Sequence, residues 1–115
     1  MTAKISNISF SYDETAEVCT MTVNNEEAGE IKLAGEDIML AEIYDEFQGR
    51  GLYSMFLTAA LNLSGKQVLY STDRNEFSNP CYEKWTGNED LEKEEKVVVF
   101  IDSEKLYVIV ASEVE

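Results

Sequence analysis

The chain has 115 residues, which is enough for one domain around a single core and too few for two. It carries 23 acidic against 9 basic residues, and the resulting net charge of −14 excludes a surface built to bind nucleic-acid phosphates or anionic lipid. It contains no histidine, which excludes Cys/His zinc sites and Ser-His or Cys-His nucleophilic pairs.

The acidity favours cationic partners, such as lysine-rich protein surfaces or polyamines. Two other interpretations stay open: the charge serves only solubility, or it imitates DNA and targets nucleic-acid-binding proteins. The opening MTAKISNISFSYDET lacks the apolar core of a signal peptide, and no stretch approaches the roughly 18 apolar residues of a membrane span. We therefore expect a cytoplasmic protein with no membrane partner, whose thiols Cys19 and Cys81 are reduced.

The first forty or so residues predict a meander of short antiparallel strands. ISFSY (8–12) and VCTMTV (18–23) alternate apolar and polar residues, and EIKL (30–33) predicts a short third strand. The segments between them, DETAE, NNEEAGE and AGED, read as turns. The run IMLAEIY (38–44) is almost continuously apolar, which is typical of a central strand covered on both faces.

The second half of the chain predicts two helices separated by strands. LYSMFLTAALNL (52–63) places Leu52, Phe56, Ala59, Ala60 and Leu63 at helical spacing, and Gly65 ends that helix. QVLYST (67–72) is a second central strand. Asn79-Pro80 predicts the N-cap and first position of a short helix over CYEKW, which stops near Gly87. A charged loop and a hairpin, KVVVFID with KLYVIVA, complete the chain.

This order predicts one domain over residues 1–115, of the α/β or layered α+β class. Its sheet is mixed and mostly antiparallel, with about six to seven strands and a central strand-loop-helix-strand-helix unit.

The segment QGRGLYS (48–54) stands where the apolar strand gives way to the first helix. A helix start carries unpaired N–H groups and the positive end of the helix dipole, so it stabilises an anion. Gly49 and Gly51 let the backbone approach a phosphate, while Gln48, Arg50 and Ser54 add side-chain donors. The alternative is a tight turn in which glycine serves only geometry. The spacing matches neither a Walker loop nor the dinucleotide-binding fingerprint.

QGRGLYS resembles the acyl-CoA-binding motif of the GNAT acetyltransferase superfamily, Gln/Arg-x-x-Gly-x-Gly/Ala. Gln48 and Gly51 match its first and fourth positions, and Tyr53 departs from its sixth. RNEFSNPCYEKW is similar to the family's Asn-x-x-Ala-x-x-x-Tyr-Glu-Lys segment, with Asn75 and Tyr82 at the matching separation. The resemblance covers about residues 38–87 and implies a GNAT-like fold of minimal size; short members occur, including phage-encoded ones.

The resemblance implies that acetyl-CoA binds as a co-substrate, with its pantetheine arm in a splay between the two central strands. Its pyrophosphate would lie on backbone N–H groups of residues 49–54. The implied cofactor contacts are Ile43, Asp45, Gln48, Gly49, Arg50, Gly51, Leu52, Tyr53, Ser54 and Asn75.

Tyr82 matches the family's general acid, which protonates the departing sulfur. Its alternative role is that of a half-buried aromatic on a short helix. A carboxylate must serve as the base, and Glu42 is favoured because an acid in an apolar central strand would have a raised pKa. Asp45 and Glu46 could also serve, and Glu42 could instead face solvent. No metal is implied.

The function predicted is transfer of an acetyl group from acetyl-CoA to a primary amine, either a protein lysine or a small cationic amine. The alternative is a catalytically inactive, acidic module of the same fold that docks on a basic, nucleic-acid-binding protein. Tyr53 bears on the choice: pointing sideways into the core it leaves its N–H free for phosphate, and pointing inward it crowds the cofactor.

Overall fold

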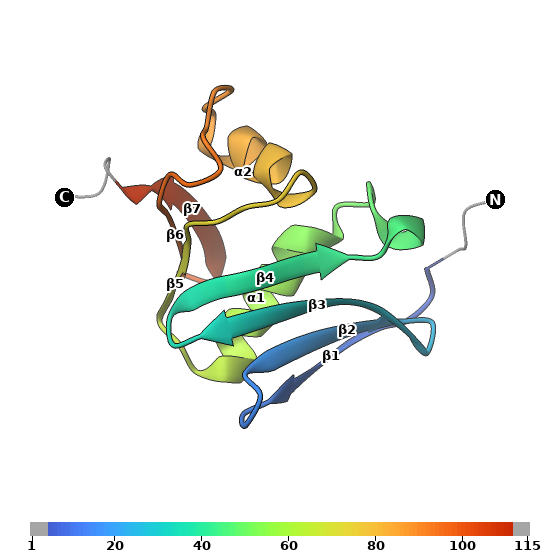
Figure 1. The fold of residues 1–115 in the computed structure, drawn as a ribbon. Helices are drawn as coiled ribbons and strands as arrows, with labels where there is room; N and C mark the ends of the chain where they lie inside the picture. The colour runs from blue at the N-terminus through green and yellow to red at the C-terminus, as the bar shows by residue number, and fades with distance from the viewer. Residues whose placement is uncertain (1–4, 112–115) are drawn as a thin grey trace.

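The computed structural model describes residues 5–111, which form one seven-stranded sheet and two helices (Figure 1). The elements are β1 (Ile8–Asp13), β2 (Val18–Val23), β3 (Glu26–Ala34), β4 (Asp37–Ile43), the 3-10 helix η1 (Asp45–Phe47), α1 (Leu52–Ser64), β5 (Val68–Ser71), α2 (Ser78–Thr86), β6 (Val97–Asp102) and β7 (Lys105–Val110). The predicted α+β class and the predicted order of strands and helices are confirmed.

The strands lie in the sheet in the order of the chain, β1 to β7. Neighbouring strands are antiparallel except for β4 and β5, which are parallel and share the single pair Asp37↔Tyr70. The sheet curls, so that β1–β4 and β5–β7 form two wings (Figure 1). Helix α1 packs on β1–β3 and β6, whereas α2 packs on β7.

The core follows the alternation that the sequence displays. On β2 the side chains of Cys19, Met21 and Val23 are fully buried, as their shared face predicts. Helix α1 buries Phe56, Leu57 and Ala60, but Leu63 is 45% exposed and its predicted place on the apolar face is wrong. It lies in the last turn of α1, next to the C-cap Gly65.

Three other predictions are corrected. The turn after β2 is only Asn24-Asn25, both at positive φ, so β3 begins at Glu26 rather than four residues later. Strand β4 is not covered on both faces, since Met39 is 60% exposed. Helix α2 begins at Ser78, because the Asn75 side-chain oxygen accepts the N–H groups of Phe77 and Ser78 and so starts the helix earlier.

Strand β4 contains a bulge that shapes the middle of the sheet. Lys32 pairs with Leu40 and Leu33 pairs with Ile38, which leaves Met39 as an extra residue. A bulge bends its strand and increases the local twist. It lies two residues after the β4–β5 pair at Asp37, and beyond that pair the two strands diverge (Figure 1).

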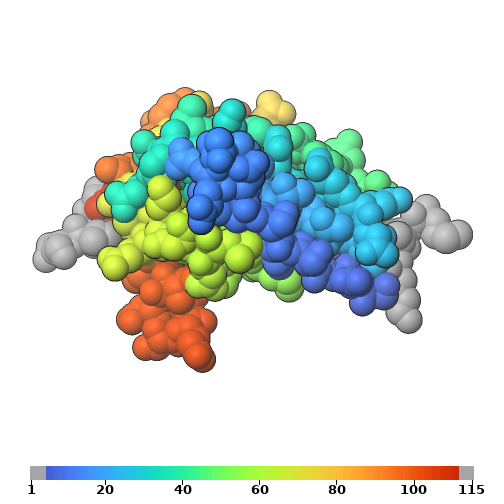
Figure 2. All heavy atoms as spheres, turned by 90° about the horizontal axis from the view of Figure 1, so that it is seen from below, coloured from blue at the N-terminus to red at the C-terminus, as the bar shows by residue number. Residues whose placement is uncertain are grey.

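The β6–β7 hairpin projects from the body of the molecule (Figure 2). Its turn is Ser103-Glu104, both at positive φ, which confirms the predicted hairpin. Over residues 5–111 there is no helix with the length and apolarity needed to cross a membrane.

Candidate functional site

The start of α1 leaves its backbone donors without a side-chain cap. The N-cap is Gly51 at φ 72°, and no side chain accepts a hydrogen bond there. Gly49 is also left-handed, at φ 75°, so the chain needs glycine at both places. A Cβ built on either residue would meet nothing within 4 Å. The loop is therefore open in front of the first-turn N–H groups, which is the arrangement that an anion requires.

The predicted side-chain donors of this loop turn back onto the backbone before it. Gln48 Nε2 donates to the Ile43 carbonyl oxygen at 2.7 Å and to Asp45 Oδ1 at 3.4 Å. Arg50 donates to the Glu46 carbonyl oxygen at 3.2 Å. In this geometry the main chain, rather than these side chains, presents the donors of the loop.

The diverging edge of β4 carries backbone groups that β5 does not pair. Tyr44 N–H donates to Ala28 of β3, so the odd-numbered Ala41 and Ile43 face the opposite edge. The Ala41 carbonyl oxygen accepts from Asn75 Nδ2 at 3.5 Å, and the Ile43 carbonyl accepts from Gln48. Two predicted site residues thus cover the edge on which a ligand with amide groups would pair.

Two clefts lie in this region. The first, of 190 Å³, lies in the splay between residues 38–41 of β4 and the end of β5, where Ser71 and the following Asp73, Arg74 and Asn75 line it. The second, of 260 Å³, lies in front of the loop, among Gly49 and Gly51 of the loop, Ser54 of α1, and Lys84 and Trp85 of α2.

Tyr53 lines both clefts and separates them. Its ring lies against Phe77, Tyr82 and Trp85, with ring centroids 5.5, 5.8 and 5.4 Å away. Its hydroxyl oxygen is 3.1 Å from that of Tyr82. The side chain that departs from the family motif is therefore buried between α1 and α2 at the border of the two clefts, and its N–H remains in the first turn of α1.

Tyr82 is completely buried and lines neither cleft. Burial raises the pKa of its phenol, while hydrogen bonds with Tyr53 and Ser71 and the charge of Arg74 act in the opposite direction. Burial also raises the pKa of Tyr53 well above its ordinary value. Both phenols therefore hold their protons at neutral pH.

Arg74 is a residue that the sequence analysis missed. Only 4% of it is exposed, and its guanidinium donates to Asn79 Oδ1, to the Ser71 carbonyl and hydroxyl oxygens, and to the carbonyls of Glu92 and Glu95. None of these bonds, all within residues 5–111, reaches a carboxylate. The guanidinium carbon lies 5.2 Å from the Tyr82 ring centroid. A positive charge that is hydrogen-bonded only to neutral acceptors in this part of the chain is therefore held beside the two phenols.

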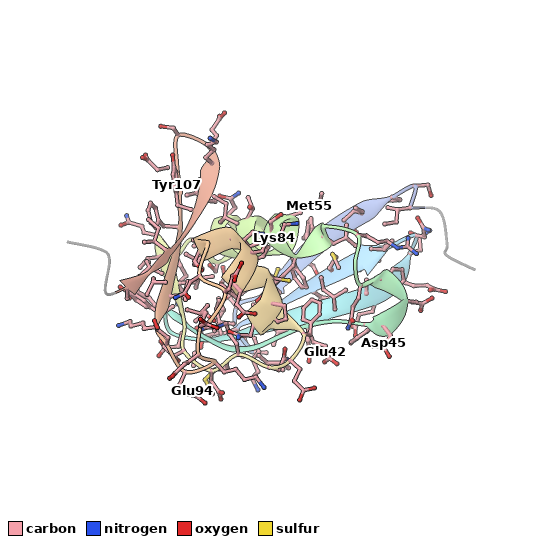
Figure 3. All side chains as sticks on the ribbon, turned by 90° about the horizontal axis from the view of Figure 1, so that it is seen from above. Glu42, Asp45, Met55, Lys84, Glu94 and Tyr107 are labelled. Carbon is pink, nitrogen blue, oxygen red and sulfur yellow. The ribbon has the colours of Figure 1, made fainter. Side chains whose placement is uncertain are left out.

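The carboxylates expected to act as a base lie outside the clefts. Glu42 is exposed on β4 opposite Glu30, and Asp45 is exposed in η1 (Figure 3). Glu46, the next residue of η1, is exposed as well. The apolar surroundings that the sequence suggested for Glu42 are not what it has. Asp73, which was not singled out from the sequence, lines the first cleft.

The remaining predicted contacts fall at the edges of this region. Ile43 and Leu52 are buried and line the second cleft, while Ser54 is half-buried there and its carbonyl accepts from Thr58. Cys19 and Cys81 are free. No group of three or more potential metal ligands is found in residues 5–111.

Comparison of the chain with protein-family models, with curated proteins and with solved structures finds no match.

Proposed function

We propose that this chain is a small N-acyltransferase with a GNAT-like fold that moves an acetyl group from acetyl-CoA to a primary amine. The observation that carries the proposal is the junction of three features. The one parallel strand pair diverges after a single contact, a bulge bends β4 there, and an uncapped helix start follows β4 directly. The resemblance in QGRGLYS and RNEFSNPCYEKW calls for a splay and an anion loop in this relation.

In this proposal the pyrophosphate of acetyl-CoA lies in the second cleft, on the N–H groups of residues 49–54. The dipole of α1 and the exposed Lys84 add positive potential in a chain that is otherwise strongly acidic. The pantetheine amides pair with the edge of β4 at Ala41 and Ile43. The long Asn75 bond to Ala41 is the weaker of the two covering bonds, so it is the one that a ligand displaces at lower cost.

Each cleft is smaller than the roughly 300–1,000 Å³ of a typical small-molecule site. A ligand as large as acetyl-CoA would therefore have to span both clefts. A co-substrate with a diphosphate at one end and a thioester at the other would occupy the second cleft with the first group and the splay with the second.

The acceptor in this proposal is a cationic amine, either a protein lysine or a small amine, in keeping with the charge of −14. The amine must lose a proton to become a nucleophile. Glu42, Asp45 and Glu46 are the carboxylates that the sequence offers for this step, and the structure adds Asp73 because it lines the cleft in the splay.

Titration with acetyl-CoA, followed by heat of binding and by thermal unfolding, tests the proposal. We expect Gly51→Glu to abolish binding, since it adds a negative charge and a side chain where the loop is open. Gly65→Glu is the matched control, because Gly65 caps the other end of α1 at φ 74° and also has open space around it. Both variants strain a left-handed position by about 1–2 kcal/mol, but only the first should lose the ligand-induced rise in Tm.

Absence of saturable acetyl-CoA binding by the unaltered protein would contradict the proposal. Equal affinity in Gly51→Glu and Gly65→Glu would remove the loop from the site while leaving an acyl-CoA site elsewhere.

Tyr53 favours a second candidate, a non-catalytic acidic module that docks on a basic, nucleic-acid-binding protein. Its ring lies between the two clefts, where the family motif has glycine or alanine. A protein of this second kind would show no acetyl-CoA binding and would form a salt-sensitive complex with a basic partner.

A further inference from the structure

The family resemblance assigns the acid to Tyr82, yet the tyrosine that lines the clefts is Tyr53. Tyr82 has no exposed surface and lines neither cleft. Tyr53 lines both, and its hydroxyl lies 3.1 Å from the Tyr82 hydroxyl. The residue that looks like a defect in the motif thus stands between the matched tyrosine and the space in which a ligand would lie.

Tyr82 is held rigidly behind Tyr53. Its ring meets Tyr53 and Trp85 edge to face, at 84° and 73°, and the Arg74 guanidinium lies over it. The five hydrogen bonds of Arg74 join the end of β5, helix α2 and the loop before β6. A fixed positive charge in a site screened from water stabilises negative charge that develops nearby.

We propose that Tyr53 is the acid of the acyl transfer and that Tyr82 positions its hydroxyl group. This inference rests on the proposed function, whose substrate acetyl-CoA it takes over. Tyr53, which departs from the family pattern, would then take part directly in the reaction.

The amine nitrogen forms a bond with the carbonyl carbon, the carbon–sulfur bond breaks, and its electron pair goes to sulfur. The Tyr53 hydroxyl proton moves to that sulfur, which leaves as a thiol. The amine gives its surplus proton to a carboxylate or to water, and solvent entering the cleft reprotonates Tyr53.

The groups around Tyr53 keep it protonated until it acts. Burial is the main cause that raises the pKa of Tyr53. Tyr82 and Cys81 on α2 raise it further, and Arg74, on the chain before α2, lowers it. Burial lowers the pKa of Arg74, whereas Tyr82 and the charges of Glu95 and Glu94, on the loop before β6, raise it. Arg74 is therefore the cation that favours the phenolate of Tyr53 after proton transfer.

The test compares Tyr53→Phe, Tyr82→Phe and the double variant, with turnover measured on acetyl-CoA and a panel of amines. Phenylalanine keeps the ring contacts in each case. We expect Tyr53→Phe to lower kcat on the order of 10²–10⁴-fold, with little change in the KM for acetyl-CoA. Tyr82→Phe should lower kcat by about tenfold, which corresponds to one lost hydrogen bond. Tyr70→Phe, on β5, is the control and should keep full turnover.

The double variant separates positioning from a purely structural role. If Tyr82 acts through the Tyr53 hydroxyl, Tyr82→Phe has no further effect once that hydroxyl is gone, and the double variant equals Tyr53→Phe. Multiplicative losses, or a larger loss in Tyr82→Phe than in Tyr53→Phe, would overturn the assignment while leaving the acyltransferase intact. Failure of the unaltered protein to bind or turn over acetyl-CoA would overturn the proposed function and this assignment together.

Discussion

Tyr53 and Arg74 show how much of the site depends on single side chains. Tyr53 divides one surface region into two clefts, and Arg74 uses all five of its N–H donors to hold the wall behind it. The sequence displayed Tyr53 as a departure from a motif and could not say where its ring goes. The sequence did not distinguish Arg74 from the other eight basic residues, because three of its acceptors are 5 to 21 residues away along the chain.

The thiol of Cys19 is completely buried on β2. Burial raises the pKa of its thiol from 9.0 to about 11. The unfolded chain loses this proton at a lower pH than the folded chain, so the stability present below pH 9 is lost as the pH rises toward 11. We expect this one group to reduce the free energy of unfolding by about 2 kcal/mol.

Urea unfolding at about pH 8 and about pH 10.5 measures this loss. In Cys19→Ala the starting stability is lower because a small cavity forms, but the alkaline loss should be smaller. The raised pKa values of Tyr12 and Tyr44 act in both proteins and so cancel in the comparison. An equal alkaline loss in the two proteins would show that Cys19 does not titrate as described.

The limits of a helix or strand were predicted correctly where the residues inside that segment set them. The limits of β2, the Gly65 end of α1 and the turn of the β6–β7 hairpin follow from alternation and turn residues. The beginning of β3 was not predicted, because the glutamates at 26 and 27 look like turn residues. In the structure a two-residue asparagine turn precedes them, and they belong to the strand. The start of α2 was moved by a cap three residues upstream.

Gly29 of β3 pairs with Met21 of β2 and with Ile43 of β4, beside a bulge at Ala28. A Cβ on Gly29 would lie 2.2 Å from the Glu42 carbonyl oxygen. Gly29→Ala must therefore push β3 and β4 apart, and we expect it to cost about 2–3 kcal/mol of unfolding free energy.

Gly35→Ala is the control for Gly29→Ala. Gly35 is left-handed at φ 63° with nothing within 4 Å of an added Cβ, so it should cost only the backbone strain of about 1 kcal/mol. Urea unfolding of the two variants measures the difference. A smaller loss for Gly29→Ala than for Gly35→Ala would mean that the two strands yield easily at this point.

The whole molecule combines a compact body with a large excess of one charge. The molecule measures 41 × 32 × 26 Å, which exceeds the Debye length of about 10 Å at 0.1 M salt, so repulsion acts mainly between neighbouring acidic groups. Self-repulsion of this kind destabilises the folded state, and salt relieves it. The charge thus sets solubility and the sign of a partner, and leaves the fold to the apolar pattern.

We expect the Tm to rise by about 4–8 °C between low salt and about 0.5 M NaCl, equivalent to about 1 kcal/mol. Thermal unfolding followed by circular dichroism measures this. The same series near pH 4.2, where the net charge vanishes, is the control and should show little rise. A rise of the same size at both pH values would assign the effect to general salting-out rather than to charge.

The sequence by itself determined the number and order of the strands and helices, the glycines at the two ends of α1, and the sign of the molecular charge. These depend on neighbouring residues, through the periods of strand and helix, the turn chemistry and the sum of charges. Only the tertiary structure decided that β4 bulges at Met39 and parts from β5, that Arg74 is buried, and that two tyrosines 29 residues apart meet. Such contacts depend on which distant segments pack together when the core forms, and the local sequence pattern does not specify that packing.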